Sequence, residues 1–199
     1  MSMIGFLKRA TDEQLDRLLA DPRLIEPFVH EGQDFTGIPL KVGWLGRLLG
    51  MKPPEPPEPA KLPADWPAST EGDETDLDKS WHGLHFLLTG SDWEGEEPLC
   101  YLIQGGEYVG DIDVGYGPAR ALKSEQVGRF AEALSALSPE DLRQRFDPER
   151  MQAWDIYPTV WVEEGSEALE TYLLPYFDTL REFVQVTADQ GKGLVVWLA

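Results

Sequence analysis

The residues best placed to do chemistry are Asp78, His82 and His85, which stand at spacings of four and three in one apolar segment. On a helix these spacings put the two imidazoles on consecutive turns of one side, with the carboxylate a turn earlier. Such a set is suited to ligating a metal or to orienting an acid–base histidine. The alternative is that Asp78 caps the helix and both histidines hydrogen-bond within the core. Because structural zinc sites take four ligands and the chain has no HExxH or CxxC motif, we expect no bound metal and no cofactor.

A second candidate site is the glycine-rich segment Gly115-Tyr116-Gly117-Pro118-Ala119-Arg120. Its backbone is suited to a concave turn that binds a small anion beside Arg120, and Tyr116 is suited to stacking on a ring. The alternative is a turn between a strand and a helix that requires glycine, with Arg120 paired to a carboxylate.

The loop at residues 154–158 supplies two further candidate ligand-binding residues, Asp155 and Tyr157. Loops carry function more often than the core does. The alternative is that Trp154 and Tyr157 cover the edge of the core while Asp155 caps a neighbouring element.

The charge of the chain is strongly acidic. Its 199 residues include 17 Lys and Arg against 36 Asp and Glu, a net charge of −19. Nucleic acids and anionic membranes are bound through basic side chains, so we expect neither as a partner. A basic protein would be attracted, particularly to residues 55–97, where Lys61 and Lys79 are the only basic residues. The alternative is that the acidic load serves only to keep the protein soluble.

The cellular compartment is predicted from what the sequence lacks. The single cysteine, Cys100, excludes an internal disulfide. The first residues do not form a signal peptide, and no apolar run approaches the ~18 residues of a membrane span. We therefore expect a soluble cytoplasmic protein, and the sequence leaves its oligomeric state open.

Capping residues mark most of the predicted helices. A capping box joins Thr11 to Gln14, and a cap followed by proline marks three further starts. Gly90 is expected to end the helix at 78–90 in the left-handed conformation, and Pro175 to kink the last helix. The predicted helices begin at Thr11, Asp21, Asp78, Ser124, Ser138, Asp147 and Ser166, with a short helix at residues 44–49.

The strand signals are fewer. Residues 99–103 and 108–112 predict a hairpin, and the apolar run at 193–198 predicts a strand buried on both faces. We therefore predict a single α+β domain over residues 1–199: a small mixed sheet with a central hairpin and a C-terminal strand, covered by several helices. A Pro- and Glu-rich surface loop is expected at about 51–75. The expected core includes Leu84, Leu88, Phe130, Phe177, Leu180, Val195 and Trp197.

Four segments resemble the YfbM-like family of bacterial proteins, a family without an assigned function. They are Leu77-Asp78-Lys79-Ser80-Trp81-His82-Gly83-Leu84-His85-Phe86-Leu87-Leu88-Thr89-Gly90, together with Met3-Ile4-Gly5, residues 115–120 and Asp155-Ile156-Tyr157-Pro158. The resemblance covers nearly the whole chain, with the motifs in the same order. It implies an α+β domain that occurs as a small bacterial protein, and it implies no activity.

These observations favour a non-enzymatic protein-binding module, of the kind that acts as an inhibitor or immunity partner of a basic protein. The alternative is a small-ligand enzyme with a pocket around His82, His85, Tyr116 and Arg120. A deep pocket lined by those side chains would favour the enzyme. A flat acidic face with both histidines buried and hydrogen-bonded would favour the binding module.

Overall fold

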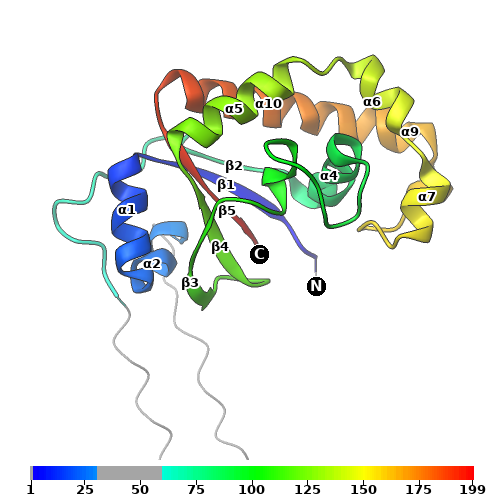
Figure 1. The fold of residues 1–199 in the computed structure, drawn as a ribbon. Coiled ribbons are helices and arrows are strands. Elements are labelled where there is room, and N and C mark those ends of the chain that lie inside the picture. The colour runs from blue at the N-terminus through cyan, green and yellow to red at the C-terminus, as the bar shows by residue number, and fades with distance from the viewer. Residues whose placement is uncertain (1, 31–59) are drawn as a thin grey trace, which may run out of the picture.

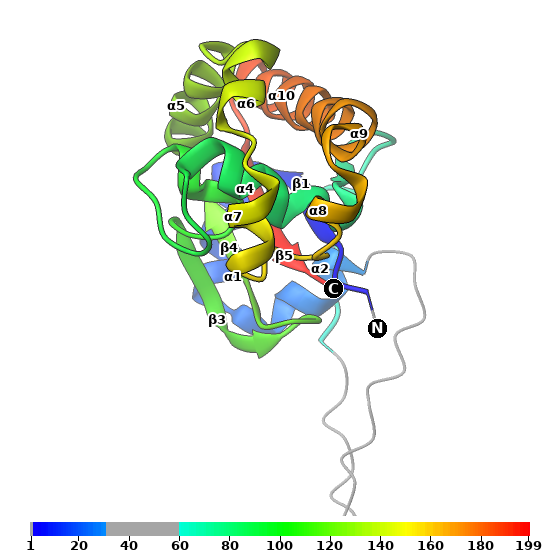
Figure 2. The same ribbon diagram turned by 90° about the vertical axis from the view of Figure 1, so that its right-hand side faces the viewer.

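A five-stranded sheet in the order β2-β1-β5-β4-β3 forms the centre of the computed structural model, which describes residues 2–30 and 60–199 (Figures 1 and 2). All four strand pairings are antiparallel. The α+β class is therefore confirmed, and the sheet is antiparallel throughout rather than mixed. The strands are β1 (Gly5–Ala10), β2 (Glu74–Asp76), β3 (Glu107–Asp113), β4 (Pro118–Leu122) and β5 (Gly193–Leu198).

The C-terminal strand β5 lies at the middle of the sheet, between β1 and β4. Its side chains alternate between two apolar clusters, with Leu194 and Val196 in one and Val195 and Trp197 in the other. The prediction of a strand buried on both faces is confirmed. So is the expected core, since none of its seven members is more than 4% exposed.

The predicted hairpin at 99–112 is wrong. Leu99–Leu102 form a 3₁₀ helix, η3, and the hairpin is made by β3 and β4, at the edge of the sheet rather than its centre. Carbonyl groups of residues 101–105 converge on the guanidinium of Arg120. Carbonyls alternate in direction along an extended strand, so only a tightly turned backbone brings them to one point.

Helices cover both faces of the sheet (Figure 1). On one face lie α1 (Asp12–Ala20), the 3₁₀ turn η1 (Pro22–Leu24) and α2 (Ile25–Val29). On the other lie α4 (Trp81–Thr89), α5 (Ser124–Ser135) and α10 (Leu174–Asp189). The remaining elements are η2 (Asp78–Ser80), α6 (Pro139–Arg145), α7 (Pro148–Ala153), α8 (Trp161–Glu164), α9 (Ser166–Ala168) and the π-helical turn η4 (Leu169–Leu173). None of the helices in the described part of the chain is both long and apolar enough to cross a membrane.

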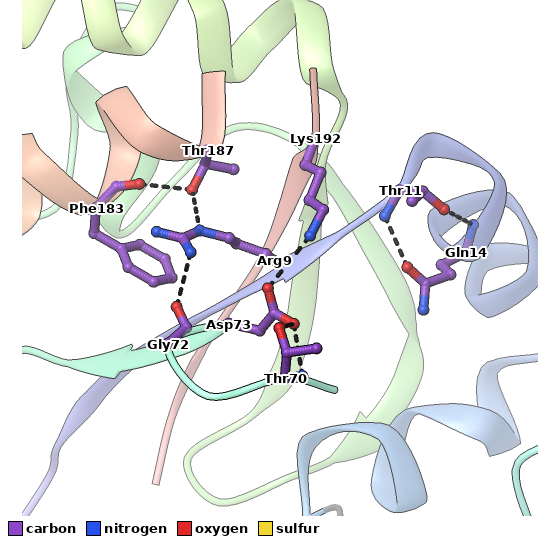
Figure 3. Close-up of polar contacts among 9 residues, drawn as sticks. All are labelled: Arg9, Thr11, Gln14, Thr70, Gly72, Asp73, Phe183, Thr187 and Lys192. Atoms are coloured by element: carbon purple, nitrogen blue, oxygen red, sulfur yellow. Dashed lines mark hydrogen bonds and ion pairs between the residues drawn. The ribbon is translucent and has the colours of Figure 1, made fainter. Parts of the chain in front are cut away.

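The local helix signals are confirmed at several positions. Thr11 and Gln14 form the expected capping box (Figure 3). Gly90 ends α4 with a φ of 75°. At Pro175, where the sequence predicts a kink, the structure has a π-helical turn just before it, in which the N–H of Leu174 bonds to the carbonyl of Leu169. Because proline has no N–H to donate, the helix is irregular next to it before α10 continues.

The segment before α4 is anchored to the sheet rather than being only a surface loop. Trp66 is 8% exposed and packs on Phe28, with a ring-centroid distance of 5.8 Å. Figure 3 shows Arg9 of β1 donating to the carbonyl of Gly72 and to the hydroxyl of Thr187. The described part of the loop predicted at 51–75 is mostly exposed and has no helix or strand before Glu74, and these contacts fix it to the rest of the fold. The predicted helix at 44–49 and the Pro-rich stretch at 53–59 lie outside the described residues.

Candidate functional site

His82 uses both ring nitrogens to join two loops. Its Nε2–H donates to the carbonyl of Asp92 (2.9 Å), and its Nδ1 accepts from the backbone N–H of Tyr157 (3.0 Å). Since a carbonyl only accepts and an N–H only donates, the imidazole is the neutral Nε2–H tautomer. Burial lowers the pKa of His82, which favours the same state. The ring contacts both Trp81 and Trp93, with centroids 4.9 and 4.6 Å away, and these two indoles also contact each other at 6.1 Å.

His85 is fully buried one turn further along α4. Its Nε2 donates to the carbonyl of Glu94 (3.0 Å), and its Nδ1 finds no hydrogen-bond partner in the described structure. Burial lowers the pKa of His85 to about 4, with smaller contributions from His82 and Arg120. Within residues 2–30 and 60–199, no group of three or more His, Cys, Asp or Glu side chains is placed to hold a metal ion.

The low pKa of His85 makes the stability of the protein dependent on pH. Between pH 6.5 and about 4 the unfolded state binds a proton at this residue and the folded state does not. The contribution of His85 to the free energy of unfolding is therefore fully present above pH 6.5 and is lost as the pH falls toward 4. The loss is roughly 3 kcal/mol, because one pKa unit corresponds to about 1.4 kcal/mol. Urea unfolding at several pH values measures the slope.

The matched variant for this prediction is His85→Gln, which keeps an N–H donor for the carbonyl of Glu94 but does not titrate. Between pH 6.5 and 4, the free energy of unfolding of this variant is expected to depend less on pH than that of the unmodified protein. The titrating carboxylates are the same in the two proteins, so the difference between the two slopes reports His85. Identical slopes would contradict the role assigned to His85.

Asp78 does not form a site with the two histidines. Its Oδ2 accepts from the hydroxyl of Tyr172 (2.8 Å), and that hydroxyl accepts from the N–H of Lys79 (3.0 Å). Burial and the nearby carboxylate raise the pKa of Tyr172. The N-cap position of α4 belongs to Ser80, so the expectation that Asp78 caps this helix is wrong. The carboxylate instead fixes η2 against η4.

Arg120 is a buried cation whose partners among the described residues are all backbone carbonyls. It is 6% exposed, and its guanidinium donates to four carbonyl oxygens: Tyr101 (3.2 Å), Leu102 (2.7 Å), Gln104 (2.6 Å) and Gly105 (3.1 Å). Burial lowers its pKa to about 10, which leaves it charged at neutral pH. Neither sequence-based interpretation, an anion site or a carboxylate pair, describes this arrangement. Its role is to hold the segment at 101–105.

The turn before Arg120 uses its N–H groups internally. Asp113 accepts from the N–H groups of Gly115 and Gly117, each at 2.9 Å, and these bonds lower its pKa. The N–H of Tyr116 donates to the carbonyl of Leu198 (2.9 Å). The backbone therefore offers no concave anion site. The side chain of Tyr116 is 42% exposed on the surface.

The loop at 154–158 closes one end of α4. The hydroxyl of Tyr157 accepts from the N–H of Met3 (3.1 Å), and its ring stacks on Trp81 at 5.9 Å. Trp154 packs its edge on Phe86 and remains 39% exposed. Asp155 is exposed, and its φ of 52° places it in the left-handed region. Tyr157 is thus brought next to His82. Within the described residues, Asp155 forms no hydrogen bond or ion pair with another predicted site residue.

A shallow, open hollow lies at residues whose backbone is bonded to the buried His85 and Arg120. Its volume is about 570 Å³, and its lining residues are Ser91, Glu94, Gly95, Glu96 and Gln104. The two buried side chains bond to the backbone of lining residues: His85 donates to the carbonyl of Glu94, and Arg120 donates to the carbonyl of Gln104. The individual residues were not predicted, although the acidic composition of residues 55–97 pointed to this region.

Negative charge dominates the surface around the hollow. No Lys or Arg occurs between Lys79 and Arg120, and Arg120 is buried. In the described structure one cation forms an ion pair with this stretch, Arg129, which lies 3.6 Å from Glu97. Arg145 and Arg150 bond to its backbone only, at the carbonyls of Leu87, Leu88 and Gly90. The exposed acidic residues of this region are Glu94, Glu96, Glu97, Glu107, Asp111 and Asp113. We name residues 91–97 and 104–113 the acidic face.

Comparison with known proteins gives a family and a fold. A family model described as a domain of unknown function (DUF1877) matches residues 1–197. Protein YfbM of Escherichia coli (strain K12) is 31% identical over 96 residues, which are 46% of this chain and 56% of that protein, so the match spans about half the length of this relative. The crystal structure of YfbM, described as a protein of unknown function, superposes with a TM-score of 0.61 at 19% identity, covering 98% of this chain and 99% of that one. At 19% identity, the superposition on the YfbM structure shows a shared fold and nothing more.

Proposed function

This chain belongs to the YfbM-like DUF1877 family, a family defined by a domain of unknown function, and we propose that it is a non-enzymatic module that binds a basic protein through the acidic face. The observation that carries the proposal is the hollow lined by Glu94 and Glu96, two of whose lining residues, Glu94 and Gln104, are bonded through their carbonyls to buried side chains. Two carboxylates around an open space of this size are suited to a Lys or Arg side chain of a partner.

The carboxylates of the hollow are available to a partner. Within the described structure, neither Glu94 nor Glu96 forms an ion pair or a side-chain hydrogen bond, and both residues are exposed. Other acidic residues serve the fold. Asp73 accepts from Thr70 and pairs with Lys192, while the carboxylate of Asp92 accepts from Ser91 and Trp93.

Exposed aromatic side chains flank the acidic residues. Trp93 is 48% exposed, Tyr108 60% and Tyr116 42%. Trp, Tyr and Arg are the residue types that contribute most to binding energy at protein interfaces. Aromatic rings also attract Arg and Lys through cation–π contacts. A surface that combines both features supports a basic protein, such as a toxin or enzyme held by an inhibitor, as the partner.

The small-ligand enzyme receives less support from the geometry. A catalytic histidine needs a nitrogen within reach of a substrate, but both nitrogens of His82 are bonded to loop backbone and His85 is fully buried. The guanidinium of Arg120 faces four carbonyls instead of a cavity. A small molecule that raises the melting temperature only when His82 and Arg120 are intact would nevertheless support the enzyme.

The proposed function predicts salt-dependent capture that requires the hollow. The unmodified protein is used to isolate its partner from native cells, and association rates are then measured against ionic strength. The double variant Glu94→Lys/Glu96→Lys is expected to slow association roughly tenfold at low salt, because steering by opposite charges is lost. The difference should shrink as salt shortens the Debye length to about 8 Å at physiological ionic strength.

The matched control is Glu163→Lys/Glu164→Lys on α8, which makes the same change in net charge at two exposed neighbouring residues. It is expected to retain most of the association rate. Equal effects of the two double variants would show that only overall charge matters. Recovery of no basic protein would contradict the proposed function.

A further inference from the structure

We infer that His82 is a pH-sensitive switch: when its imidazole gains a second proton, Tyr157 is released from α4 while the bond to Asp92 is kept. The inference does not depend on the proposed function. The two ring nitrogens face backbone groups of opposite kinds, since Nε2–H donates to the carbonyl of Asp92 and Nδ1 accepts from the N–H of Tyr157. A carbonyl accepts from either form of the ring, but a backbone N–H requires a lone pair that the imidazolium lacks at Nδ1.

Protonation of His82 therefore affects the two loops unequally. On the Tyr157 side, two N–H groups would face each other across a contact that is 3.0 Å long in the neutral form, and one of them must move. On the Asp92 side, the hydrogen bond of 2.9 Å becomes charge-assisted and is strengthened. The loop that moves is thus the one that carries Tyr157, and the acidic face stays attached to His82.

The segment around Tyr157 is held in a backbone conformation that its residues disfavour. Asp155 and Thr159, on either side of it, have φ values of 52° and 64° in the left-handed region. Residues other than glycine keep such values only where surrounding contacts hold them. Ile156 is fully buried and its carbonyl accepts from the indole N–H of Trp161 (2.6 Å), so this residue limits the movement to the positions that follow it.

Release of Tyr157 would uncover an aromatic surface. Its ring stacks on Trp81 at 5.9 Å, and its hydroxyl accepts from the N–H of Met3 (3.1 Å). Trp81 is buried, whereas Trp93, whose ring lies 6.1 Å away, is exposed. Once Tyr157 leaves, the ring of Trp81 would join that of Trp93 on the surface. The acid form of the protein would therefore present a larger aromatic patch at this end of α4.

The groups around His82 set the direction of the switch. The other titratable groups on α4 and on the loops at 90–94 and 154–158 are His85, Asp92, Glu94, Asp155 and Tyr157, and Arg150 of α7 lies against the second loop. Burial disfavours the imidazolium more strongly than Asp92 favours it, so the pKa of His82 is lowered.

Loss of the Tyr157 contact would reverse this effect of burial. Water would then reach the ring of His82, and its pKa would return toward the ordinary value of 6.5. Release is therefore favoured as the pH falls below 6.5 and disfavoured above it. His85, with a pKa of about 4, stays neutral over most of this range.

The test follows His82 and Tyr157 by NMR in the unmodified full chain between pH 7 and about 4.5, the range in which a histidine titrates. Nitrogen chemical shifts of the imidazole report its tautomer and its protonation. Nuclear Overhauser contacts between the rings of Tyr157 and Trp81 report whether the loop is attached. We expect the Nε2–H tautomer at pH 7, and a fall of the ring contacts by roughly twofold or more with the same midpoint as the protonation of His82.

Two variants separate the two bonds of the ring. In His82→Asn, the side-chain oxygen takes the place of Nδ1 and accepts from the N–H of Tyr157 without titrating, so the ring contacts should persist at every pH. In His82→Gln, the side-chain amide takes the place of Nε2 and donates only to the carbonyl of Asp92, so the ring contacts should be weak at every pH. The control His85→Gln should respond to pH like the unmodified protein, because His85 bonds to Glu94 and not to Tyr157.

Ring contacts that stay constant while His82 gains its proton would overturn the switch, and so would a His82 that remains neutral throughout this range. An equal pH-dependent loss of the contacts in His82→Asn and in the unmodified protein would assign the change to another group and contradict the inference. The measurement on the unmodified protein decides the matter even where a variant does not fold. The salt-dependent capture of a basic protein is tested separately, through Glu94 and Glu96.

Discussion

Replacing Arg120 with methionine should lower the free energy of unfolding by roughly 3–5 kcal/mol, because each buried carbonyl left without a donor costs about 1–3 kcal/mol. The guanidinium is 6% exposed and satisfies four carbonyl oxygens of residues 101–105. Methionine fills similar space but donates nothing, so these carbonyls would lose their partner where water has little access. Urea unfolding monitored by tryptophan fluorescence measures the change.

Arg129→Met is the matched control for this prediction. Its side chain is 52% exposed and lies 3.6 Å from Glu97, so we expect a loss below about 1 kcal/mol. Arg120→Lys should fall between the two, because an ammonium retains the charge but lacks the planar five-donor fork. An Arg120→Met variant no less stable than Arg129→Met would show that the carbonyl cluster is satisfied by water.

Trp197→Ala is expected to cost about 3–5 kcal/mol, the range for truncating a large aromatic residue in the core. The side chain is 4% exposed on the central strand β5, and its ring stacks on Phe6 with centroids 5.1 Å apart. Truncation would leave a cavity between the sheet and the helices α1 and α2. Thermal and urea unfolding of the variant measure the loss.

Trp93→Ala serves as the control for Trp197→Ala, since it removes the same atoms from a side chain that is 48% exposed. We expect a clearly smaller loss, from the contacts with His82 and Trp81. A Trp197→Ala variant that melts like the unmodified protein would show that β5 is peripheral to stability.

The elements predicted correctly are those whose signals are local. The capping box at Thr11, the left-handed end of α4 at Gly90 and the apolar run of β5 each depend on a few neighbouring residues. β1 was not predicted from its pattern, because Lys8 and Arg9 interrupt it. Lys8 is 3% exposed and donates to the carbonyl of Phe28, a contact that only the folded chain provides.

The errors arise where distant parts of the chain decide the local structure. Residues 99–103 are apolar enough for a strand, but the carbonyls of Tyr101 and Leu102 accept hydrogen bonds from Arg120, about twenty residues later in the chain. The sequence likewise singles out His82 and His85 in an apolar segment and Arg120 in a glycine-rich one. It does not reveal that their partners are main-chain carbonyls of loops rather than a ligand, since neither the partner nor its distance is encoded locally.

The way the hollow is held has a consequence for how this surface diverges among relatives. His85 and Arg120 form hydrogen bonds to the main-chain carbonyls of residues 94 and 104. Every amino acid has this carbonyl group. The side chains at these two positions are therefore free to be exchanged without disturbing the scaffold. Relatives that keep the two buried donors are expected to vary the residues corresponding to Glu94 and Gln104, and so to acquire different binding preferences on an unchanged framework.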